Sequence, residues 1–268
     1  MDIVQTVNDA LYSSAADVTS IGKSAMGLDI LCAHLGSYSA PQIIITAGMH
    51  ARECYTALVV LGQIEAWYNA KGGGAYFIPL VNPDGALFFE SGETLGSPVL
   101  DRFSSRHREW KANADGVDLN TNFDANWGTG TQNKRVAGPS DFIGEYPFSA
   151  PETAALRDFT LYVMPRSTVS YHALGGELYW EFFQTGAARV RDERFATAVA
   201  DYIGVRKVDG DLGSAGGYKD WCIQTLGIPA VTVELVKYGA HPLAPSNFAE
   251  DIESNRYLPQ FILDYFID

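Results

Sequence analysis

A histidine and a glutamate three residues apart, His50 and Glu53, stand between two apolar stretches of this chain. Residues 43–46 predict a buried strand before them, and residues 54–68 predict a helix after them. At such a junction both side chains can turn toward one point, and their nitrogen and oxygen atoms suit a zinc ion. The spacing by itself is more typical of a surface ion pair or a helix start.

Two residues far along the chain could complete a hydrolytic site. A catalytic zinc takes about three protein ligands, and His172 is the natural third; its alternative is a histidine satisfied in the core or a loop. Such a site also needs a general base beside the metal. Glu234, near the end of the apolar run 231–235, is our candidate. Burying its carboxylate costs desolvation free energy unless the residue lies in a functional site or has an oppositely charged partner. A salt-bridged strand-end glutamate is the alternative.

Composition bounds the class of protein. A length of 268 residues with 47% hydrophobic residues fits one α/β domain, which we expect to span residues 1–268. The net charge of −13 argues against nucleic acid and against an anionic membrane as partners. Three scattered cysteines, Cys32, Cys54 and Cys222, predict buried thiols in a reducing compartment. Since residues 1–4 lack signal-peptide features, we expect a cytoplasmic location.

The predicted elements alternate between strands and helices. This order predicts a largely parallel sheet with helices on both faces, in which ligands gather beyond the carboxyl ends of the strands. His50 and His172 both follow predicted strands, which is where a site would be expected. We predict strands at 29–33, 43–46, 75–81, 169–171 and 231–235, and helices at 54–68, 151–162, 187–202, 217–226 and 256–266.

Two further segments are rich in turn-forming residues. Residues 110–123 and the segment Asn82-Pro83-Asp84-Gly85 both predict turns and loops by composition alone. Taken with the stretches above, they resemble the zinc carboxypeptidase family, the carboxypeptidase A-like metallopeptidases. The resemblance runs from about residue 21 to residue 234 through H-A-R-E, N-P-D-G, G-V-D-L-N-x-N-F, P-F-S-x-P-E-T, S-Y-H and T-V-E. It implies a single domain with a mixed, mostly parallel sheet of about eight strands flanked by helices.

The resemblance also implies a role for each matching residue. His50, Glu53 and His172 would bind one Zn²⁺ per chain, although their nitrogen and oxygen atoms suit other divalent metals too. Glu234 would be the catalytic base, and Asp118 would orient His50 from behind.

Two cationic residues would contact the substrate. Arg52 resembles a contact to a substrate carbonyl. Lys111 stands where the family often has an arginine, which polarises the scissile carbonyl; a lysine keeps that charge but loses the planar fork.

The chain departs from digestive carboxypeptidases where they hold the terminal carboxylate. Asn120 is kept, but Thr121 stands where an arginine is expected and Leu212 stands at the position of a mobile tyrosine. A bidentate arginine–carboxylate contact is one of the stronger polar anchors in proteins. Its loss argues against simple selection of an ordinary C-terminal residue.

The segments around Trp180 and Gly217 look closest to the bacterial γ-D-glutamyl-diaminopimelate peptidase branch. Lys219 falls at the floor of the specificity pocket, where it could meet a distal carboxylate; a solvated helical lysine is the alternative. We also predict that Trp180 and Tyr218 line the substrate groove, with core packing as the alternative for each.

The resemblance therefore predicts a peptide substrate, most specifically a muropeptide cut at the γ-D-glutamyl-diaminopimelate bond. Two other functions stay open. One is a metallocarboxypeptidase that releases acidic C-terminal residues. The other, from a different class, is a catalytically inactive zinc-containing module that binds peptides.

Overall fold

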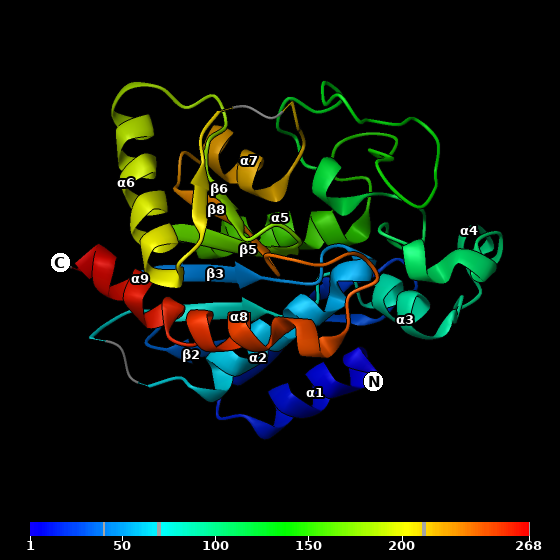
Figure 1. Ribbon diagram of the computed structural model, residues 1–268, viewed down its shortest axis with the longest axis horizontal. Helices are drawn as coiled ribbons and strands as arrows, with labels where there is room; N and C mark the ends of the chain where they lie inside the picture. Colours follow the sequence, from blue (N-terminus) through cyan, green and yellow to red (C-terminus); the bar gives the residue numbers. More distant parts are fainter. Residues whose placement is uncertain (40, 69–70, 211–212, 268) are drawn as a thin grey trace.

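An eight-stranded mixed sheet runs through the protein, in the order β1-β2-β4-β3-β5-β8-β6-β7 (Figure 1). The computed structural model describes residues 1–39, 41–68, 71–210 and 213–267. Four neighbouring strands in the middle of the sheet are parallel: β4 (Gly74–Ile78), β3 (Gln42–Thr46), β5 (Ser167–Ala173) and β8 (Ala230–Leu235). Antiparallel pairing joins them to β2 (Asp29–Gly36) on one side and to β6 (Glu177–Tyr179) on the other. At the edges, β1 (Asp17–Lys23) pairs antiparallel with β2, and β7 (Arg206–Val208) pairs parallel with β6. The predicted mixed, mostly parallel sheet is confirmed.

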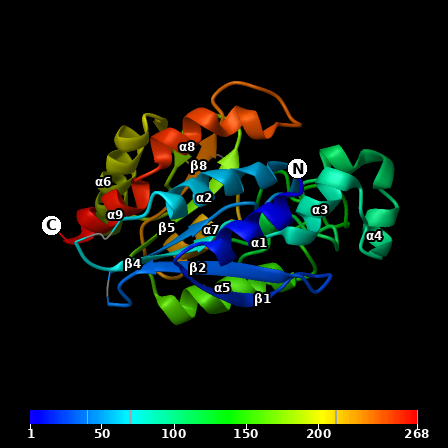
Figure 2. The same ribbon diagram turned by 90° about the horizontal axis from the view of Figure 1, so that it is seen from below.

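Helices cover both faces of this sheet (Figure 2). Residues of α5 (Pro151–Val163) and α7 (Tyr218–Gln224) pack in one apolar core, which includes Ile30 and Ile44 of the sheet. The core on the opposite face is larger, and α8 (Ala249–Asn255) packs against its outer side. The longer helices that contribute to it are α1 (Ile3–Ser13), α2 (Ala57–Glu65), α6 (Gly186–Ile203) and α9 (Leu258–Ile267), and shorter helices add further residues.

Shorter helices lie in the connections. The α-helical ones are α3 (Pro83–Ser91) and α4 (Pro98–Asp101). The 3₁₀ helices are η1 (Ala51–Thr56), η2 (Ser104–Glu109), η3 (Leu119–Thr121) and η4 (Pro245–Phe248). Among the described residues, no helix combines the length and the apolarity that a membrane crossing needs. Cys32, Cys54 and Cys222 are buried and free, which confirms the predicted thiols.

Two expectations about local structure were wrong. The segment 82–85 begins helix α3 instead of forming an isolated turn. Asn82 caps this helix by accepting a hydrogen bond from the Gly85 N–H at 2.9 Å, and Pro83 suits the first helical turn because it has no N–H to satisfy. The second concerns β5, which continues to residue 173, so His172 lies inside the strand and not beyond its end.

Two buried carboxylates fasten the β1–β2 turn to the rest of the fold. Glu152, in the first turn of α5, accepts hydrogen bonds from the Ala25 N–H and from the Asn113 amide, both at 2.9 Å. Asp84, in the first turn of α3, accepts from Ser24 Oγ and from the Met26 N–H, both at 2.7 Å. The N-P-D-G and P-E-T segments thus hold one turn from two sides. Burial raises the pKa of Glu152 to about 7, and it raises the pKa of Asp84 as well.

The Glu152→Gln variant should remove one source of pH dependence from stability. Between pH 4.5 and about 7 the folded protein keeps the Glu152 proton that the unfolded chain releases, so rising pH destabilises the wild type. Glutamine does not titrate. The free energy of unfolding of the variant minus that of the wild type should therefore rise by up to about 3 kcal/mol from pH 4 to pH 8.

Urea unfolding at several pH values measures this difference. Exposed Glu145, changed to glutamine, is the control and should follow the wild type at every pH. A difference between Glu152→Gln and the wild type that stays flat across this range would contradict the raised pKa.

Candidate metal centre

The first two ligands are brought together by a kink after β3. His50 precedes η1, and Glu53 inside η1 has φ −106° and ψ 16°, outside the helical range. This local turn places His50 Nδ1 2.9 Å from Glu53 Oε2, with both side chains buried. A regular helix begins only at Ala57, so the predicted helix 54–68 starts later than expected because the site occupies its first turn.

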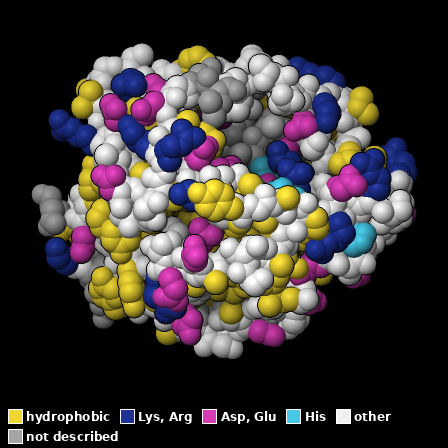
Figure 3. Space-filling model, in the orientation of Figure 1, with side chains coloured by type: hydrophobic (Ala, Val, Ile, Leu, Met, Phe, Trp, Pro, Cys, Tyr) yellow, Lys and Arg dark blue, Asp and Glu magenta, His cyan; other side chains and the backbone are white. Residues whose placement is uncertain are grey.

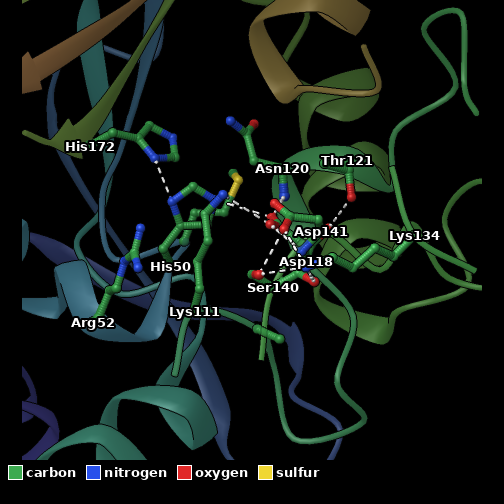
Figure 4. A network of polar contacts seen from close by, with 12 residues as sticks. His50, Arg52, Lys111, Asp118, Asn120, Thr121, Lys134, Ser140, Asp141 and His172 are labelled. Carbon is green, nitrogen blue, oxygen red and sulfur yellow. Dashed lines mark hydrogen bonds and ion pairs between the residues drawn. The ribbon is translucent and has the colours of Figure 1, made fainter. Parts of the chain in front are cut away.

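The third ligand comes from the alternation of side chains along β5. Val169 and Tyr171 point into the larger core, so Ser170 and His172 point to the opposite face. His172 Nδ1 lies 3.1 Å from His50 Nδ1 and 3.1 Å from Glu53 Oε2. Figure 4 shows the two imidazole rings next to each other.

These three atoms fit a zinc ion. They form a nearly equilateral triangle with sides of 2.9, 3.1 and 3.1 Å. A tetrahedral zinc with bonds of about 2.0–2.1 Å separates its ligands by about 3.3 Å. Among the described residues, this group alone brings three His, Cys, Asp or Glu side chains close enough to hold one metal ion.

The charges around the triangle favour a cation at its centre. Burial opposes ionisation of Glu53, but His50 and His172 outweigh it and hold the pKa of this carboxyl well below its ordinary value. Burial, together with the charge of His50, lowers the pKa of His172. Although burial disfavours a charged His50 ring, Glu53 and Asp118 raise its pKa. An ionised carboxylate and a neutral imidazole are the forms that bind metal.

Asp118 supports the site from behind. Its Oδ1 lies 3.2 Å from His50 Nε2, on the side of the ring opposite the ligand atom, as predicted. Its Oδ2 lies 2.9 Å from Lys111 Nζ and accepts the Asp141 N–H at 3.0 Å (Figure 4). Asp118 is fully buried. A carboxylate in this position fixes the tautomer and orientation of the histidine and makes it a better ligand.

Glu234 is the neighbour of His172 across the sheet. The two residues are paired in the β5–β8 register, so their side chains leave the same face of adjacent strands. Burial, and then the charge of Glu53, raise the pKa of Glu234 to about 8. In the part of the chain that the structure describes, no side-chain hydrogen bond or ion pair holds its carboxylate. Glu234 is therefore available to exchange a proton with a substrate.

A cavity of about 300 Å³ opens beside the metal ligands, and Figure 3 shows a hollow on this face with histidine and basic side chains at its edge. His50 and Glu234 both line it. Of the residues predicted to contact substrate, Lys111, Asn120 and Lys219 line this cavity. Trp180 borders it too, but this side chain is fully buried and packs in the larger core, so its contact with substrate stays a prediction.

Three predicted contacts lie elsewhere. Tyr218 is fully buried, and its hydroxyl lies 2.8 Å from Thr160 Oγ1, so its predicted place in the groove is wrong; an apolar core takes it instead. Thr121 Oγ1 donates to the Asp118 carbonyl at 2.8 Å, which closes the η3 turn. Arg52 lies beside the two imidazoles (Figure 4), partly exposed, and its Nε is buried without a hydrogen bond. Leu212 is outside the described residues.

Sequence reasoning missed Glu181, Phe182 and Asp220, which also line the cavity. Glu181 and Phe182 follow the short strand β6, which was not predicted. Asp220 directly follows Lys219 in the sequence, and this neighbouring pair of opposite charges could have indicated that Asp220 also lines the cavity.

Comparisons with known proteins agree with this geometry. The family model for zinc carboxypeptidases matches residues 4–257. The chain is 30% identical over 255 residues to gamma-D-glutamyl-L-diamino acid endopeptidase 1 of Lysinibacillus sphaericus, covering 86% of this chain and 63% of that protein. It is also 30% identical over 263 residues to the uncharacterized protein YqgT of Bacillus subtilis (strain 168), covering 85% and 67%. The chain thus spans about two thirds of these relatives.

Solved structures share the fold. Bovine thrombin-activatable fibrinolysis inhibitor, in complex with tick carboxypeptidase inhibitor, superposes with a TM-score of 0.77 at 21% identity, over 99% of this chain and 96% of the other. The murein-tripeptide amidase MpaA from Escherichia coli O157 gives 0.66 at 19% identity, over 94% and 95%.

Replacing Asp118 with asparagine should weaken zinc binding while the ligands stay in place. The variant keeps the shape of the side chain but loses the charge beside His50, so zinc affinity should fall about 10–100-fold. Competition with a chromogenic chelator measures it. Asp115→Asn, an exposed change in the same loop, is the control. Equal affinity in the Asp118 variant and the wild type would show that the carboxylate does not tune the site.

Proposed function

The chain belongs to the zinc carboxypeptidase family, and we propose that it hydrolyses the γ-D-glutamyl-diaminopimelate bond of cell-wall peptides. The observation that carries this proposal is a complete hydrolytic centre without the usual anchor for a terminal carboxylate. Thr121 replaces that arginine, and its hydroxyl is committed to the Asp118 carbonyl. The Lysinibacillus relative, whose name is that of a γ-D-glutamyl endopeptidase, supports the same bond class.

When bound, zinc supplies Lewis acidity, which makes water nucleophilic near neutral pH and polarises a carbonyl. Glu234 accepts the proton that this water loses as it attacks the scissile carbonyl. The same carboxyl then gives the proton to the leaving amine, so one residue serves as base and as acid. Its lack of a partner among the described residues leaves both oxygens available for this task.

Lys111 is placed to stabilise the oxyanion. It lines the cavity, and its ion pair with Asp118 Oδ2 at 2.9 Å holds its ammonium close to His50. Asp118 uses one of the three N–H groups of the lysine, so others can donate to the substrate. A fixed donor aimed at developing negative charge lowers the barrier more than a mobile one.

The two other candidate functions have less support. A carboxypeptidase for acidic C-terminal residues would need an anchor for the α-carboxylate, and the expected arginine position holds Thr121. An inactive binding module would have no use for an unpartnered Glu234 next to an intact set of three ligands. Three free, buried thiols support the further proposal of a reducing, cytoplasmic setting.

The Glu234→Gln variant should keep its zinc and lose its activity. Glutamine has nearly the same shape but cannot carry the proton, so kcat should fall about 10²–10⁴-fold. Metal content by elemental analysis and turnover of L-Ala-γ-D-Glu-meso-diaminopimelate are the two measurements. Glu177→Gln is the matched control, because Glu177 is the cross-strand neighbour of Glu234 on β6 but does not line the cavity. Near-normal turnover in Glu234→Gln would reject its role.

The bond is identified from products. The wild type should release diaminopimelate and L-Ala-D-Glu from the tripeptide, and a chelator should abolish this reaction. Ordinary α-linked peptides ending in glutamate should be cut at least about 100-fold more slowly, because they lack both the γ-D-glutamyl linkage and the distal charged centre of diaminopimelate. Efficient trimming of those peptides, with the tripeptide left intact, would favour the carboxypeptidase function.

A further inference from the structure

An ion pair of opposite charges lies in the wall of the active-site cavity. Lys219 and Asp220, in the first turn of α7, both line it, and Lys219 Nζ lies 2.6 Å from Asp220 Oδ1. Both side chains are about nine-tenths buried or more. The sequence alone suggested that Lys219 offers a free positive charge, but the adjacent carboxylate neutralises it.

The pair is only partly satisfied. An ammonium has three N–H donors: Lys219 gives one to the Glu181 carbonyl at 3.1 Å and forms an ion pair with Asp220 Oδ1, which accepts no hydrogen bond from the described residues. Donor capacity is left, because no described side chain accepts a further hydrogen bond from Lys219; the centroid of the Phe182 ring lies 5.5 Å from its Nζ. Asp220 Oδ2 accepts the Gly217 N–H at 3.1 Å, but a carboxylate has about four acceptor positions, so acceptor capacity also remains. One donor and one acceptor thus stand side by side at the cavity.

Two other charged groups of the cavity, Glu181 and Lys111, are committed elsewhere, whereas Glu234 has no partner among the described side chains and lies beside the metal centre. The Glu181 carboxylate lies 2.8 Å from Arg189 Nε and accepts the Gly210 N–H at 2.8 Å. Lys111 is paired with Asp118, as described above. Among the residues that the structure describes, the part of the cavity around α7 therefore carries the positive charge of Lys219 and the negative charge of Asp220 side by side.

We infer that Lys219 and Asp220 together select a leaving residue whose side chain ends in both an ammonium and a carboxylate. The distal centre of diaminopimelate has this chemistry. The carboxylate would face Lys219, and the ammonium would face Asp220. This inference rests on the proposed function, because it concerns the residue on the amine side of the scissile bond.

The charge balance makes the selection two-sided. A side chain with only an ammonium, as in lysine, could use Asp220 but would bring a second positive charge against Lys219. A side chain with only a carboxylate could use Lys219 but would repel Asp220. In a buried site, a charge left without its partner costs more than a matched pair gains, so each half-matched residue is rejected.

Three peptides of the form L-Ala-γ-D-Glu-X test the inference on the wild type. X is meso-diaminopimelate, L-lysine or L-2-aminopimelate; the last keeps the distal carboxylate and lacks the distal ammonium. We expect kcat/KM for diaminopimelate to exceed that for either of the others by about 100-fold, since each leaves one buried group unpaired. Cleavage of all three peptides at rates within about threefold would overturn the inference and leave the proposed function standing. If none is cleaved, both fall.

Two variants assign the selection to the pair. Asp220→Asn keeps an oxygen for the Gly217 N–H but cannot attract an ammonium, so the preference for diaminopimelate over 2-aminopimelate should shrink at least tenfold. Lys219→Gln should shrink the preference for diaminopimelate over lysine instead. Glu193→Gln, on α6 and outside the cavity, should change neither ratio.

A purely structural role predicts a different pattern. Either substitution would then lower turnover of all three peptides equally, with reduced zinc content or a lower melting temperature, and that result would overturn the inference. The ratios measured with the wild type decide the matter even if one variant does not fold.

Discussion

The close approach of three buried ligand atoms is the constraint on which the rest of the site depends. Glu53 carries a negative charge in a place where burial alone would neutralise it, and two imidazoles within about 3 Å make that charge stable. Such a cluster is favourable only around a cation, because the partners of a buried charge must compensate for its lost hydration. The kink in η1 places Glu53 beside His50, and the β5–β8 register places Glu234 beside His172.

Layers of alternating charge extend from this centre. Asp118 lies behind His50, Lys111 binds the other oxygen of Asp118, and Asp141 contributes its N–H to the same carboxylate. Each layer orients the one in front of it. In a chain with a net charge of −13, these layers hold one cationic group, Lys111, in a fixed position at the cavity.

Much of this could be predicted from the sequence, and the exceptions have physical reasons. The buried parallel strands were predicted because their residues form apolar runs, and His50 and His172 were found because histidine is rare here and follows such runs. The edge strand β1 was missed because its side chains are mostly exposed and show no clear alternation, and β6 and β7 have only three residues each. Tyr218 was misplaced because α7 is too short for periodicity to show which of its faces is buried.

Substrate recognition is the property of this site that sequence motifs predict least well. Loss of the arginine at Thr121 removes one strong anchor, and a free lysine at position 219 would have been a simple replacement for it. The structure excludes that simple replacement, because Asp220 lies 2.6 Å from the ammonium. In the recognition that we infer, binding energy for the leaving residue would come from matching both charges at once, at the end of its side chain. Selection by a neutral pair is stricter than selection by a single charge, since it rejects ligands of either sign.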